Sequence, residues 1–135
     1  MSGALLDTSI LLADDEASAS RDRPTTTAIS VVTLGELRAG VLRARDDRTR
    51  AARQQRLIAV RARLAPLPVD ESVAEHYGDA LAHARSVGRA AKATDLLIIA
   101  TARATGRTLH TLDRAQAGLA RELGVAVSGV SRADR

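Results

Sequence analysis

Cysteine, phenylalanine and tryptophan are absent from this sequence, and Tyr77 is its only aromatic residue. The absence of cysteine excludes a disulfide framework, a thiol nucleophile and any zinc or iron–sulfur site built on cysteine. The near absence of aromatic rings leaves little of the base stacking on which single-strand nucleic-acid binding commonly relies. The hydrophobic share is nevertheless 45%, most of it alanine, leucine, isoleucine and valine. We therefore expect a closely packed aliphatic core.

Long apolar runs are also missing. No segment approaches the roughly 18 consecutive apolar residues that a membrane span needs. The N-terminal stretch has no basic leader, and Asp7 interrupts its apolar residues, so it does not resemble a signal peptide. We expect a cytoplasmic protein without a membrane partner. The length of 135 residues predicts a single domain over 1–135, of which the last few residues form a tail.

Lysine is nearly absent too, since Lys92 is the only lysine among 20 basic residues. The planar guanidinium of arginine suits phosphate and carboxylate recognition. A chain rich in arginine and alanine is, however, also what a GC-rich genome produces. The net charge of +4 therefore permits a polyanionic partner without demonstrating one.

Short apolar runs alternate with stretches of helical periodicity along the chain. We expect strands at 3–6, 25–29, 67–69, 108–112 and 125–127, a loop over 14–24, and helices at 10–13, 31–45, 48–64, from a cap at 70 or 72 to about 87, 95–105 and 114–123. Strands that alternate with helices indicate a parallel sheet covered on both faces. The predicted fold class is α/β, a three-layer α/β/α arrangement around a short, mainly parallel central sheet.

Four acidic residues fall where predicted strands end or the following helices begin. Asp7 and Asp113 directly follow strands, Glu36 lies one turn into a helix, and Asp95 lies in the first turn of an almost wholly apolar helix. Ligands gather at the carboxyl ends of parallel strands, so we expect the four carboxylates at one rim of the sheet. Burying them together without compensation is costly. Mg²⁺ or Mn²⁺, which prefer oxygen ligands, would relieve that cost and support phosphodiester hydrolysis.

Each acid also has a simpler structural interpretation. Asp95 can interact with the dipole of its helix, Glu36 can form a capping box with Thr33, and Asp113 can cap the helix that begins at residue 114. Asp7 has fewer structural uses, because it directly follows a buried strand. Independent capping does not predict that four acids share one rim, and this favours a joint role.

Four segments, in order and spacing, resemble the signature motifs of the PIN domain, in particular those of its VapC-type toxins. The segments are residues 5–9, 30–37 with Gly40, 94–102 and 109–113. The resemblance implies a PIN-like fold and a Mg²⁺- or Mn²⁺-dependent endoribonuclease that hydrolyses RNA phosphodiester bonds. It also implies the toxin role in a type II toxin–antitoxin pair, a VapB-type antitoxin as partner, and a homodimer.

The same resemblance implies a role for individual residues. Asp7 and Asp95 would be the main metal ligands, Glu36 a ligand or the base that orients water, and Asp113 a ligand directly or through water. The small hydroxyl positions that line the pocket in the family correspond to Thr8, Ser9 and Thr111.

The chain departs from the family pattern in two places. Many members carry a phenylalanine a few residues past the fourth acid, and this chain has none. An aspartate or asparagine often precedes the third acid, where this chain has Ala93 and Thr94. The pocket is therefore expected to be one polar group poorer.

Other interpretations of the sequence remain open. A catalytically silent PIN-fold module that binds RNA or protein would not need the complete acidic set. A DNA-binding regulator would need an exposed recognition helix, and the helix over 95–105 is too apolar for that. The nine arginines between Arg38 and Arg63 form a solvated face, an RNA-backbone surface or an antitoxin-facing groove. His76 and His83, seven residues apart, are interpreted as a solvated or packed helix face.

Overall fold

The computed structural model describes residues 3–13 and 26–129. The strands are β1 (Ala4–Leu6), β2 (Ala28–Ser30), β3 (Ala65–Leu67), β4 (Thr108–His110) and β5 (Val127–Ser128), and the helices are α1 (Thr8–Ala13), α3 (Val31–Leu42), α4 (Asp47–Arg63), α5 (Glu71–Ser86), α6 (Ala93–Thr105) and α7 (Arg114–Glu122). The order of these elements confirms the prediction. The predicted loop over 14–24 and the predicted C-terminal tail lie outside the described residues.

The strands form one sheet in the order β3-β2-β1-β4-β5. Strand β1 pairs in parallel with β2 on one side and β4 on the other, and β3 and β5 extend the sheet in parallel at its two edges. Leu5 of β1 lies opposite both Ala28 and Leu109. The first strand of the chain is therefore the central strand of the sheet.

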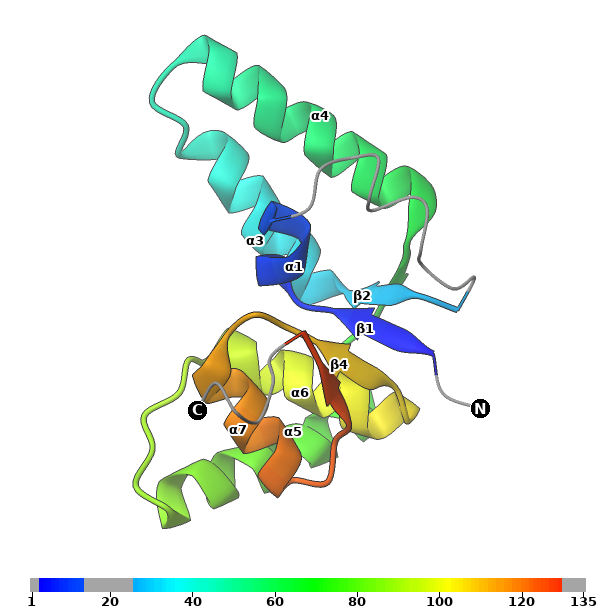
Figure 1. The fold of residues 1–135 in the computed structure, drawn as a ribbon, viewed down its shortest axis with the longest axis vertical. Helices are drawn as coiled ribbons and strands as arrows, with labels where there is room; N and C mark the ends of the chain where they lie inside the picture. The colour runs from blue at the N-terminus through cyan, green and yellow to red at the C-terminus, as the bar shows by residue number, and fades with distance from the viewer. Residues whose placement is uncertain (1–2, 14–25, 130–135) are drawn as a thin grey trace.

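Helices cover both faces of this sheet (Figure 1). Neighbouring residues of a strand point to opposite faces, and the two leucines of β1 accordingly belong to different clusters of the core. Leu5 packs with Ile98 and other residues of the α5, α6 and α7 layer. Leu6 packs with residues of the α1, α3 and α4 layer, among them Val41. The predicted three-layer α/β/α fold is thus confirmed.

Helices α3 and α4 form a hairpin that extends away from the sheet (Figure 1). Asp46 caps α4 by accepting a 2.7 Å hydrogen bond from the backbone N of Thr49. Arg50 donates to the Ala44 carbonyl at 2.8 Å, and Arg53 donates to the Gly40 carbonyl at 2.7 Å. Two of the arginines between residues 38 and 63 therefore hold the hairpin together. Among the described residues, no helix is both long and apolar enough to cross a membrane.

The strands differ a little from their predicted bounds, and those predicted at 25–29 and 108–112 are Ala28–Ser30 and Thr108–His110. The strand predicted at 67–69 is β3, which contains Pro66. Proline has no N–H for a second ladder, and β3 tolerates it because it is an edge strand that pairs only with β2. The strand predicted at 125–127 begins at Val127, since the N–H of Val125 donates to the Ala120 carbonyl at 2.9 Å and still belongs to the end of α7. The predicted helix over 31–45 likewise ends early, at Leu42.

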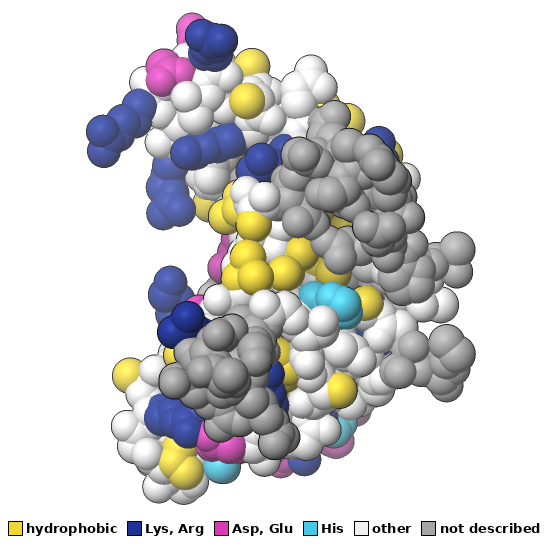
Figure 2. Space-filling model, viewed as in Figure 1, with side chains coloured by type: hydrophobic (Ala, Val, Ile, Leu, Met, Phe, Trp, Pro, Cys, Tyr) yellow, Lys and Arg dark blue, Asp and Glu magenta, His cyan; other side chains and the backbone are white. Residues whose placement is uncertain are grey.

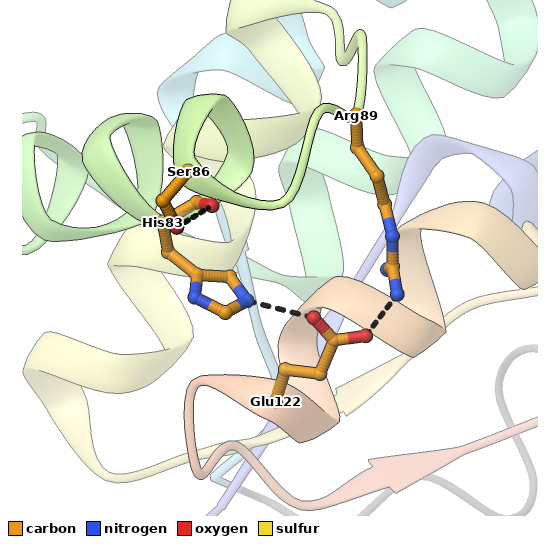
Figure 3. Close-up of polar contacts among 4 residues, drawn as sticks. All are labelled: His83, Ser86, Arg89 and Glu122. Atoms are coloured by element: carbon orange, nitrogen blue, oxygen red, sulfur yellow. Dashed lines mark hydrogen bonds and ion pairs between the residues drawn. The ribbon is translucent and has the colours of Figure 1, made fainter.

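A polar cluster ties α5 to α7 (Figure 3). Glu122 of α7 lies between His83, whose Nε2 is 2.7 Å from Glu122 Oε1, and Arg89, which pairs with Oε2. The hydrogen bond from His83, and then Arg89, lower the pKa of Glu122. His76 contacts Arg103 at 3.3 Å, so both histidines form interhelical contacts, as the packed-face interpretation predicts.

Candidate active site

The fold brings the candidate residues to the carboxyl end of the central strand. From β1 the chain moves outward to β2 and β3, whereas β4 and β5 lie on the other side of β1. The strand order therefore reverses between β1 and β4, and ligands of open α/β sheets bind at such a switch point. Asp7 follows β1 and Thr111 follows β4. Both residues are buried.

The Asp7 carboxylate lies at the centre of a hydrogen-bond network. Its Oδ2 accepts from the backbone N of Ser9 at 3.1 Å, from Ser9 Oγ at 2.7 Å and from Thr111 Oγ1 at 3.3 Å. Its Oδ1 accepts from Gln116 Nε2 at 3.3 Å. Only 5% of Asp7 is exposed, so these donors compensate much of the cost of burying it. Ser9 and Thr111 thus contact Asp7, and their role in lining the pocket stays a prediction.

Asp95 lies in the first turn of α6, but its side chain does not cap the helix. The N-cap position is Lys92, which makes no side-chain capping bond. Burial, followed by the charges of Asp7 and Asp113, raises the pKa of Asp95 to about 6, while Lys92 opposes the rise and Glu36 adds to it. The other three acids therefore lie near enough to Asp95 to repel its charge, and the role of the four acids as metal ligands stays a prediction.

Glu36 joins the site through a long-range contact. Thr8 Oγ1 donates a 2.6 Å hydrogen bond to Glu36 Oε1, linking the start of α1 to α3. The alternative capping box with Thr33 is wrong, because α3 begins earlier and is capped by Ser30, whose Oγ accepts from the backbone N of Val32. Thr33 Oγ1 is buried without a hydrogen-bond partner. Glu36 is therefore available to the site.

Asp113 is the cap of α7, as its structural interpretation predicted. Its Oδ1 accepts from the backbone N of Gln116 at 3.0 Å. Its own backbone N donates to Thr111 Oγ1 at 3.0 Å. The residue thus begins α7 while its charge acts on Asp95, and a capping role does not remove it from the site.

The carboxylate oxygens of the four acids are the kind of ligand atom that a hard divalent cation prefers. Burial, followed by the charges of Asp7 and Asp113, makes a negative charge on Asp95 costly. Within residues 3–13 and 26–129, however, no three histidine, aspartate or glutamate side chains converge closely enough to hold an ion. An ion bound by three of these carboxylates would require at least one of them to move.

Sequence reasoning missed Gln116, which is 2% exposed and contacts three parts of the site. Its Oε1 accepts from Thr111 Oγ1 at 2.7 Å, and its Nε2 reaches Asp7 Oδ1 at 3.3 Å and the Asp95 carbonyl at 3.4 Å. One signal was present, because Asp113 and Gln116 have the spacing of a capping box. That pattern describes a helix start and does not reveal the long-range contacts.

Basic pockets lie on both sides of the acids. A pocket of about 430 Å³ between α1, α3 and α4 includes Glu36, Arg43 and Arg56. A second pocket, of about 290 Å³, includes Asp95 together with Arg89 and Lys92. Figure 2 shows the molecule hollowed on its left side, with acidic atoms in the hollow and basic side chains above and below it. Glu36 and Asp95 therefore line a cleft that also has basic side chains in its walls.

Gly129 lies close to the backbone of Thr111, a residue of the site. Its φ is +100°, and an added Cβ would lie 2.5 Å from the Thr111 carbonyl oxygen. We expect Gly129→Ala to lower the free energy of unfolding by about 1–3 kcal/mol, the usual cost of a strained backbone position. Gly78→Ala in the exposed middle of α5, where a Cβ meets nothing, should instead stabilise by about 0.5–1 kcal/mol. Urea denaturation of both variants checks this, and equal effects would contradict it.

Comparison with known proteins agrees with this geometry. The PIN domain family model matches residues 4–122. Ribonuclease VapC8 from Mycobacterium tuberculosis is 41% identical over 100 residues, which are 73% of this chain and 88% of that protein. Ribonuclease VapC4 from the same organism is 35% identical over 118 residues, 86% of this chain and 90% of that protein.

A solved structure leads to the same family. It is described as a member of the VapBC family of toxin–antitoxin systems, VapBC-5, from Mycobacterium tuberculosis. The similarity has a TM-score of 0.81 and 34% sequence identity, and it covers 96% of this chain and all of the matched one. This chain therefore belongs to the PIN-domain family, and within it to the group of VapC ribonucleases.

Proposed function

We propose that this protein is a metal-dependent endoribonuclease that cleaves RNA in the acidic cleft and acts as the toxin of a toxin–antitoxin pair. One observation carries the proposal: Asp7, Asp113 and Glu36 lie near enough to Asp95 to raise its pKa, beside the switch point of the sheet. The names of the relatives, which are ribonucleases, support the reaction class.

The proposed cofactor is Mg²⁺ or Mn²⁺. Asp7 and Asp95 would be its main ligands, with Asp113 as a further ligand directly or through water. When bound, such an ion lowers the pKa of water and neutralises charge that develops on a phosphodiester. Glu36, held by Thr8 at 2.6 Å, is the residue we assign to orient the attacking water and take its proton. The basic walls of the cleft would hold the phosphates on either side of the bond that is cut.

Phosphate contacts by arginine predict a measurable salt dependence. Arg43 and Arg56 line the pocket beside Glu36, and each lost phosphate contact should reduce the log–log salt slope of single-strand binding by about 0.7. We expect the double variant Arg43→Ala/Arg56→Ala to flatten the slope by roughly 1.4 on this basis. The measurement is fluorescence anisotropy of a labelled single-stranded RNA over a range of salt concentrations, in an Asp7→Asn background that does not cleave it.

The control for this prediction is Arg61→Ala, in the exposed last turn of α4, which should leave the slope unchanged. An unchanged slope in the double variant would assign Arg43 and Arg56 to a role other than RNA binding.

The proposed partners are the RNA substrate, a VapB-type antitoxin and a second copy of the chain. The antitoxin proposal is supported by the solved relative, which is described as a member of a toxin–antitoxin family. The homodimer follows from the family resemblance. Light scattering of the chain alone and with an antitoxin encoded beside it would measure both assemblies.

The deciding experiment is cleavage of a total-RNA pool by the purified chain with Mn²⁺ or Mg²⁺, with a chelator, and with Asp7→Asn in parallel. Discrete fragments that require both the metal ion and Asp7 would support the ribonuclease. If the folded chain cleaves nothing and calorimetry detects no ion binding, the catalytically silent binding module replaces the proposal. Cleavage that persists in chelator would overturn the metal dependence alone.

A further inference from the structure

We propose that Gln116 is a positioning residue of the active site, whose side-chain amide orients the Asp7 carboxylate and fixes the first turn of α6 against it. The inference rests on the proposed ribonuclease function and adds a residue that the four acidic motifs do not contain.

The contacts of Gln116 join four elements at one point. The side-chain Nε2 donates to Asp7 Oδ1 after β1 at 3.3 Å and to the Asp95 carbonyl in α6 at 3.4 Å. Its Oε1 accepts from Thr111 after β4 at 2.7 Å, and its backbone N bonds the Asp113 cap of α7 at 3.0 Å. A shift of this one side chain would therefore disturb the relation between Asp7 and the first turn of α6, which carries Asp95.

The burial of Gln116 indicates that its side-chain amide is needed for the hydrogen bonds it makes, and not to fill space. Gln116 is 2% exposed, and an apolar side chain fills such a position without the cost of burying polar atoms. The family resemblance implies a phenylalanine a few residues past the fourth acid, and this chain has none. The amide also supplies a polar group to a pocket that was expected to be poorer at Ala93 and Thr94. A buried amide at this position is best explained by its hydrogen bonds to Asp7, Thr111 and the Asp95 carbonyl.

The two oxygens of Asp7 are held unequally. Oδ2 accepts from Ser9 twice and has Thr111 Oγ1 3.3 Å away, whereas Gln116 is the one described residue that donates to Oδ1. Without the amide, Oδ1 loses its donor and the Thr111 hydroxyl loses its 2.7 Å acceptor. Partners of metal ligands commonly change metal affinity or activity by about 10–100-fold when they are replaced. We expect an effect of that order here.

The test replaces Gln116 with methionine, which has a similar length and volume but no amide. The matched control is Gln55→Met on the exposed face of α4. Calorimetry measures Mn²⁺ binding by each protein, and cleavage of one defined RNA gives kcat and KM. For Gln116→Met we expect Mn²⁺ binding weaker by about 10–100-fold and a comparable fall in kcat. Gln116 lines the pocket that contains Asp95, but Gln116→Met retains every basic side chain of both pockets. The KM for RNA should therefore be unchanged, and Gln55→Met should behave as the wild type.

Wild-type Mn²⁺ affinity and kcat in Gln116→Met would overturn the proposal and leave Gln116 as a packing residue. A loss in KM alone would also overturn it. If the methionine variant does not fold, Gln116→Asn retains an amide that is too short to reach Asp7, and the same losses are expected. A wild-type chain that binds Mn²⁺ but cleaves no RNA would overturn the ribonuclease, while the Mn²⁺ affinities would still decide the role of Gln116. A wild-type chain that does neither would overturn both.

Discussion

The Asp7→Asn variant is expected to lose RNA cleavage by at least about 100-fold while it stays folded. A bound metal ion contributes several kcal/mol of charge stabilisation in the transition state, and about 1.4 kcal/mol corresponds to a factor of ten in rate. Asparagine has the shape of aspartate but not its charge, so the ion loses a main ligand. The fold should persist because the amide oxygen of asparagine can still accept from Ser9. A flip of the Gln116 amide would present its Oε1 to the new NH2 group.

Steady-state cleavage of one defined RNA in Mn²⁺ measures this loss, and circular dichroism checks the fold. The matched control is Asp79→Asn, an exposed aspartate on α5 that pairs with Arg103 at 2.7 Å, outside the acidic cleft. This control should cleave at the wild-type rate. If Asp7→Asn also cleaves at that rate, Asp7 is not a metal ligand and the assignment of the site is wrong.

Asp95→Asn is expected to abolish cleavage as well, yet to stabilise the metal-free protein near neutral pH. The pKa of Asp95 is raised to about 6 in the native state, chiefly by burial and then by Asp7 and Asp113. Between about pH 4 and pH 6 the unfolded chain therefore releases the Asp95 proton while the native state retains it, so rising pH favours unfolding. A shift of this size corresponds to at most about 3 kcal/mol, and solvent screening reduces it to roughly 1–2 kcal/mol.

Urea denaturation at pH 4.5 and pH 7.5 in the presence of a chelator measures this effect. The advantage of Asp95→Asn over the wild type should be larger at pH 7.5, where native and unfolded Asp95 are both charged. Added Mn²⁺ should stabilise the wild type and not the variant, because an ion that binds only the native state shifts the equilibrium toward it. The same advantage at both pH values would show that repulsion at Asp95 does not limit stability.

Much of the architecture could be predicted because it depends on local patterns. The alternation of apolar runs with helical periodicity predicted the order of strands and helices, and the parallel sheet followed from that order. The positions of Asp7 and Asp113 directly after strands predicted a shared rim, since all parallel strands end on the same side. The exact ends of β3 and β5 could not be predicted, because they depend on edge pairing and on the closing hydrogen bonds of α7.

The sequence by itself therefore determined the fold class, the acidic motifs and the family that these motifs indicate. Only the tertiary structure decided how those acids are held. The contact of Thr8 with Glu36 spans 28 residues of sequence, and that of Gln116 with Asp7 spans 109. Such contacts form where distant strands meet, and no local periodicity encodes them. For the same reason Gln116 resembled an ordinary helix residue in the sequence, whereas packing against the ends of β1 and β4 made it part of the site.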